Sequence, residues 1–158
     1  GFTEIVINVH HFADQILDFL QANHNFGVDI HISDETEELL DTGGGLEKAG
    51  KYFISSCHED KNGILLHNVD ILSNCNLQDL IRFHQQTPDV YATMLVSRRI
   101  TPLLLNKGMK PGKYSIIDFY LQACKNIRIQ GYPVDNLQLI DIGKPETLIK
   151  AEEFLNQL

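Results

Sequence analysis

The chain has 158 residues, of which 43% are hydrophobic and 22% are charged, and this composition suits a single domain with a real core. Its 13 Lys and Arg residues against 21 Asp and Glu residues leave a net charge of −8, which disfavours nucleic acid or an anionic membrane as a partner. A phosphorylated small substrate remains compatible with this charge, because a bound metal ion can offset it locally.

In chain order, short apolar runs alternate with segments of helical periodicity over the first hundred residues. The predicted strands are 4–9, 28–33, 63–72, 90–97, 127–134 and 137–142. The predicted helices are 12–23, 46–52, 76–86, 115–126 and 145–158. This alternation predicts an α/β fold in which helices cover both faces of a mostly parallel sheet, with the runs "EIVINV", "ILLHNV" and "YATMLVS" as inner strands.

Two places interrupt this pattern. A full strand signal follows Gly1-Phe2-Thr3 at once, without a lead-in. Near Thr101-Pro102 a strand ends and a helix-like remnant follows, with no crossover between them. We therefore expect a single domain over 1–158 that is incomplete at its N-terminus and near 101–102.

The cysteines Cys57, Cys75 and Cys124 are odd in number and show no C-x-x-C spacing. This usage is typical of reduced thiols in a cytoplasmic protein. No apolar run approaches the roughly 18 residues of a membrane span, and no signal peptide is recognisable. We therefore expect a cytoplasmic location.

Two aspartates follow apolar runs, where ligands bind in open α/β sheets. Asp70 follows "GILLHNV", and Asp141 follows "LQLI" and precedes "IGKPE". Two carboxylates from separate strand ends can converge on one divalent cation, and their hard oxygen atoms suit Mg²⁺. The alternative is that each aspartate only caps a turn.

The stretch "LLDTGGGLEKAG" contains three consecutive glycines, Gly43, Gly44 and Gly45. Glycine loses more conformational freedom on folding than other residues, so either a turn needs its freedom or another group packs directly against its backbone. One interpretation is a plain loop leading into a helix. The other is a flat backbone surface for a nucleobase. The spacing matches neither a Walker A loop nor G-x-G-x-x-G.

Taken together, the stretches "GFTEIVINVHHFADQILDFL", "LLDTGGGLEKA", "ILLHNVDIL", "YATMLVS" and "LIDIGKPETLIKAEEFL" resemble, in this order, the sugar-1-phosphate nucleotidylyltransferases of the nucleotidyltransferase superfamily. Within it they are most similar to bacterial muramate- or mannose-1-phosphate uridylyl- and guanylyltransferases. The resemblance implies a Rossmann-like three-layer α/β/α sandwich with a mostly parallel (mixed) sheet. It also implies transfer of a nucleotide from a nucleoside triphosphate to a sugar 1-phosphate, with release of pyrophosphate.

The resemblance also implies roles for particular residues. Asp70 and Asp141 would hold Mg²⁺ at the catalytic centre, with Asn68 beside them. Thr42 and the glycines 43–45 would form part of the nucleotide pocket.

The chain departs from the family pattern in two places. The family's glycine-rich phosphate loop at the N-terminus and its middle segment near the sugar have no counterpart here. A protein that lacked this loop would lose its main grip on the triphosphate, and we would then expect no catalysis. The alternative function is therefore a non-catalytic domain that binds a nucleotide or sugar phosphate on the same fold.

Overall fold

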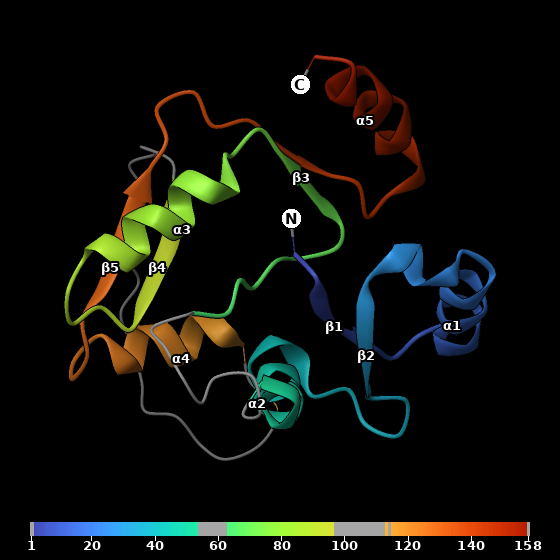
Figure 1. Cartoon of the computed structure of the whole chain (residues 1–158), viewed down its shortest axis with the longest axis horizontal. Helices are drawn as coiled ribbons and strands as arrows, with labels where there is room; N and C mark the ends of the chain where they lie inside the picture. Colours follow the sequence, from blue (N-terminus) through green and yellow to red (C-terminus); the bar gives the residue numbers. More distant parts are fainter. Residues whose placement is uncertain (1, 54–62, 97–112, 114, 158) are drawn as a thin grey trace. The chain divides into compact units, whose positions relative to one another are not determined.

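The computed structural model describes residues 2–53, 63–96, 113 and 115–157 and shows a mixed α/β protein (Figure 1). The chain divides into two compact units. The first unit comprises residues 1–60 and 105–126, and the second comprises 61–104 and 127–158. The break predicted at Thr101-Pro102 and the cysteine Cys57 lie outside the described residues.

A parallel pair of strands forms the centre of the first unit. β1 (Glu4–Val9) pairs with β2 (Asp29–Asp34), so that Glu4 lies opposite Asp29 and Val9 opposite Asp34. β1 is rich in Ile and Val and β2 contains Ile30 and Ile32, residue types that favour extended backbone. The connection between them contains α1 (Ala13–Ala22), as the sequence predicts for a parallel crossover.

The two faces of β2 carry different helices. Successive side chains of a strand point to opposite faces. Ile30 and Ile32 lie on the side of α1, whereas the His31 ring stacks on Tyr52 of α2 (Asp41–Phe53) with ring centroids 5.2 Å apart. The strand β2 thus has α1 on one side and α2 on the other.

The helix α2 begins earlier than the sequence predicts. The glycine triplet was expected to be a loop before a helix at 46–52, but α2 starts at Asp41 and includes all three glycines. Its first turn is linked to α4 (Ile116–Ala123), because the Ile116 amide donates a 2.8 Å hydrogen bond to the Thr42 hydroxyl oxygen.

The second unit contains two separate strand pairs. β3 (Ile71–Ser73) pairs antiparallel with β6 (Leu139–Asp141), and β4 (Ala92–Val96) pairs parallel with β5 (Ile129–Pro133). The helix α3 (Leu77–Gln86) packs on the latter pair, where the Phe83 and Tyr132 ring centroids are 5.0 Å apart. The short helix η2 (Pro145–Thr147) leads from β6 into α5 (Leu148–Leu155).

The strands differ from the prediction in two respects. Within the described ranges each strand has a single partner, so "EIVINV" and "YATMLVS" are not inner strands there. The predicted strand 63–72 is reduced to β3, and residues 64–68 before it form no strand. An apolar run indicates extended backbone, but a strand also needs a neighbouring chain to bond, which the run itself does not specify. Two of the three observed pairs are parallel.

Candidate functional site

The two predicted aspartates lie side by side in the second unit. Asp141 is the last residue of β6 and pairs with Ile71, the first residue of β3. Asp70 immediately precedes β3, and its carbonyl oxygen accepts a 2.8 Å hydrogen bond from the Ile142 amide. The predicted closeness of the two residues is confirmed. It arises from an antiparallel pair, however, and not from the ends of parallel strands.

Gly143 shows how closely the two carboxylates converge. A Cβ atom built on this glycine would lie 3.1 Å from Asp141 Oδ1 and 3.2 Å from Asp70 Oδ2. Both oxygen atoms therefore face the same small space beside the Gly143 backbone. The Gly143 amide donates a 2.9 Å hydrogen bond to Asp141 Oδ1, which fixes the orientation of that carboxylate.

This arrangement fits a divalent cation. Asp70 is half-buried and Asp141 is exposed, and neither forms an ion pair among the residues the structure describes. Each carboxylate retains lone pairs beyond the contacts given above. Mg²⁺ is commonly held by one or two carboxylates together with substrate phosphates and water, so two protein ligands suffice. The described residues contain no group of three or more His, Cys, Asp and Glu side chains suited to a metal ion.

Asn68 lies in the turn that precedes Asp70. Its carbonyl oxygen accepts a 3.3 Å hydrogen bond from the Ile71 amide, and the residue is exposed. The turn 68–71 thus contains both Asn68 and Asp70.

The predicted nucleotide-binding residues lie in the first unit, at the start of α2. Thr42 is exposed, and its hydroxyl oxygen accepts the bond from Ile116 while its hydrogen remains available as a donor. Gly43, Gly44 and Gly45 are buried in the first turns of the helix. The expectation that these glycines border an open pocket is therefore wrong.

Side chains from β1 and from the residue after β2 occupy the space beside Gly45. A Cβ atom on Gly45 would lie 2.6 Å from Glu35 Oε1 and 2.8 Å from Asn8 Nδ2. At Gly45 the structure therefore shows close packing against the backbone. This is one of the two explanations given above for the glycine triplet.

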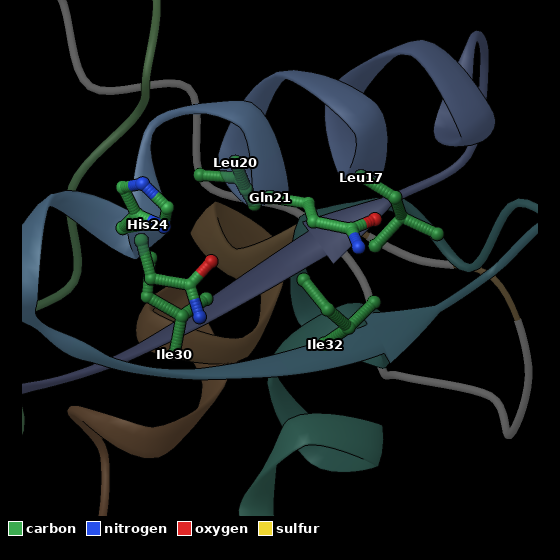
Figure 2. A pocket seen from close by; sticks show the side chains of 7 residues that line it. Leu17, Leu20, Gln21, His24, Ile30 and Ile32 are labelled. Carbon is green, nitrogen blue, oxygen red and sulfur yellow. The ribbon is translucent and has the colours of Figure 1, made fainter.

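A cavity of about 530 Å³ in the same unit lies elsewhere, between α1 and β2 (Figure 2). Leu17, Leu20 and Gln21 of α1 line it from one side, and Ile30 and Ile32 of β2 from the other. The predicted site residues contribute nothing to its lining.

The sequence analysis did not point to three residues of the site: Asn8 and Glu35 beside the glycine triplet, and Gly143 beside the aspartate pair. Glu35 lies in the acidic stretch "SDETEE", which has the composition of a solvated loop. Gly143, two residues after Asp141 in the turn "DIGKP", carried the clearer signal, since a glycine next to a candidate ligand indicates close approach to the backbone.

The thiol of Cys75 is poorly suited to act as a nucleophile. Burial raises the pKa of its thiol, and the neighbouring carboxylate of Asp79 raises it further. The thiol therefore stays protonated at neutral pH, whereas a nucleophilic cysteine needs its thiolate form.

Comparison of the sequence with models of known protein families gave no match, and comparison with curated proteins gave none either. Within the described ranges, no helix combines the length and the apolar character needed to cross a bilayer.

Proposed function

We propose that the protein to which these residues belong is a Mg²⁺-dependent nucleotidylyltransferase that joins a nucleoside triphosphate and a sugar 1-phosphate to give an NDP-sugar and pyrophosphate. The observation that carries the proposal is the convergence of Asp70 and Asp141 on one space beside Gly143. The ordered resemblance of five sequence stretches to this enzyme family supports it. The proposal includes a three-layer α/β/α arrangement around a mostly parallel sheet, and a cytoplasmic location.

The reaction consists of one displacement at phosphorus. A phosphate oxygen of the sugar 1-phosphate attacks the α-phosphorus of the triphosphate and forms a new P–O bond. The bond from the α-phosphorus to the bridging oxygen breaks, and pyrophosphate leaves with its electron pair. Positioning and neutralisation of charge supply most of the catalysis in such reactions.

The side chains have separate tasks in this proposal. Asp70 and Asp141 hold Mg²⁺, which when bound neutralises negative charge on the phosphates. The Gly143 amide keeps the Asp141 carboxylate in its orientation. Asn68 contributes polar groups beside the metal, and the Thr42 hydroxyl hydrogen, left unused by its bond with Ile116, donates to the nucleotide.

The test is release of pyrophosphate from each of the four nucleoside triphosphates with a panel of sugar 1-phosphates and Mg²⁺. Asp70→Asn and Asp141→Asn keep the shape of each side chain but remove its charge. We expect each to lower turnover at least about a hundredfold. The double variant should be little worse than either single one, because residues that serve one ion act as a unit.

Asp18→Asn is the matched control, since it removes an exposed carboxylate from α1. It should retain full activity. Turnover that survives in either site variant would contradict the proposal. Binding of nucleotide and Mg²⁺ without turnover by the unaltered protein would instead support the alternative, a non-catalytic domain that binds a nucleotide or sugar phosphate.

A further inference from the structure

Glu35 is a buried carboxylate, with 4% of its surface exposed. Its Oε1 atom accepts a 2.6 Å hydrogen bond from Asn8 Nδ2, and its Oε2 atom accepts a 3.1 Å hydrogen bond from the Leu40 amide. No Lys or Arg in the described part of the chain forms an ion pair with it. Burying a carboxylate is costly unless hydrogen bonds compensate, so both donors matter to this residue.

The two donors come from different elements. Asn8 belongs to β1, and Leu40 is the residue immediately before α2. The Glu35 backbone adds a third link, because its amide donates a 2.7 Å hydrogen bond to the Val9 carbonyl oxygen at the end of β1. Glu35 thus joins the end of β1 to the start of α2.

The same pair of side chains also lies against the backbone of α2. A Cβ atom on Gly45 would approach Glu35 Oε1 to 2.6 Å and Asn8 Nδ2 to 2.8 Å, closer than packed atoms allow. The Asn8–Glu35 pair therefore occupies the place of a side chain at position 45. The start of α2 is therefore in contact with this pair at position 45.

We infer that Glu35, held by Asn8, is a positioning residue that sets the geometry of the segment 42–45 at the start of α2. The inference rests on the proposed function, in which the exposed Thr42 of this segment donates a hydrogen bond to the nucleotide. In that case the Asn8–Glu35 pair controls nucleotide affinity without touching the nucleotide. The placement of the segment itself can be tested whether or not a nucleotide binds.

A charge swap tests the inference without creating a cavity. Asn8→Asp places a second carboxylate against Glu35, so the 2.6 Å hydrogen bond is replaced by repulsion between like charges. Adding Glu35→Gln restores one donor and one acceptor, since the Gln amide can donate to Asp at position 8 while its oxygen still accepts from Leu40. Asn156→Asp, at an exposed position after α5, controls for the added charge.

The first measurement is amide hydrogen exchange over residues 40–46 at pH 7, with the amides of α3 as an internal reference. We expect exchange at least about tenfold faster in Asn8→Asp, and a rate close to that of the unaltered protein in the double variant and in Asn156→Asp. If Asn8→Asp does not fold, folding and normal exchange in the double variant support the inference. Unchanged exchange in Asn8→Asp, or a double variant as perturbed as the single one, would overturn it.

The second measurement is the affinity for each of the four nucleoside triphosphates in the presence of Mg²⁺. We expect about tenfold weaker binding in Asn8→Asp and recovery in the double variant. An unaltered protein that binds none of the four contradicts the proposed function, and hydrogen exchange then decides the inference alone. Nucleotide binding that is equal in all variants while exchange differs would overturn the link between the Asn8–Glu35 pair and affinity.

Discussion

The absence of a side chain at Gly143 leaves room between two carboxylates. Asp141 Oδ1 and Asp70 Oδ2 both border this room, and the Gly143 amide holds one of them by a hydrogen bond. Gly143 is exposed and does not have a positive φ, so neither burial nor backbone conformation requires glycine there. Approach of the carboxylates to the backbone is the physical reason that the structure offers for a glycine.

Gly143→Ala should therefore weaken the binding of Mg²⁺ without unfolding the protein. The new methyl group would lie 3.1–3.2 Å from both oxygen atoms, and each carboxylate would have to move by a few tenths of an ångström. We expect about a tenfold loss of Mg²⁺ affinity, the size of effect seen when groups around metal ligands are altered. Isothermal titration calorimetry measures it. Equal affinities in the variant and the unaltered protein would show that the room beside Gly143 does not hold the ion.

At the scale of elements, α2 forms although its first turns contain three residues of low helix propensity. Each glycine is less favourable than alanine in a helix interior by about 1 kcal/mol, and the triplet occupies the first turns. Packing offsets this cost, because a helix with side chains at position 45 could not lie so close to Glu35 and Asn8.

Two alanine substitutions in α2 should have effects of opposite sign on the free energy of unfolding. A Cβ atom on Gly50 meets nothing within 4 Å, so Gly50→Ala should stabilise the protein by about 0.5–1 kcal/mol through helix propensity alone. Gly45→Ala should destabilise it by about 1–3 kcal/mol, because its methyl group separates Asn8 from Glu35 and leaves buried polar atoms without partners.

Urea denaturation at pH 7 compares the two substitutions in the same helix. A rise in the free energy of unfolding for both variants would show that the Asn8 and Glu35 side chains move to accommodate a methyl group at little cost in free energy. Hydrogen exchange over residues 40–46 would then locate any movement.

At the scale of the whole molecule, net charge links stability to the salt concentration. The net charge of −8 means that any salt reduces repulsion within the folded chain. An ion that binds specifically to the native state raises the free energy of unfolding further. The increase is about 2.7 kcal/mol when the ion's concentration is a hundred times its dissociation constant.

Mg²⁺ should therefore raise the free energy of unfolding more than NaCl of equal ionic strength does. Asp70→Asn should remove this difference and leave the NaCl effect in place. Denaturant titrations in the two salts measure both terms. If Mg²⁺ stabilised Asp70→Asn as much as the unaltered protein, the gain would come from general screening and not from the aspartate pair.

The sequence by itself determined the elements whose signals are local. The helix α3 begins after Asn76, whose side-chain oxygen accepts hydrogen bonds from the Gln78 and Asp79 amides at 3.0 and 3.3 Å. Ser115 likewise accepts a bond from the Ile117 amide at the start of α4. Caps and helical periodicity involve residues within a few positions of each other, so the chain displays them directly. The candidate aspartates were also recognisable, because each follows an apolar run.

Only the tertiary structure decided how distant segments meet. Asp70 and Asp141 come together through the antiparallel pairing of β3 and β6, which no local sequence pattern predicts. The surroundings of Gly45 in α2 likewise depend on Glu35 and Asn8, from other elements, which fill the space beside it. In each case the deciding atoms lie far away in the sequence. Propensity describes what a segment prefers alone, whereas packing and strand pairing depend on which partner it meets.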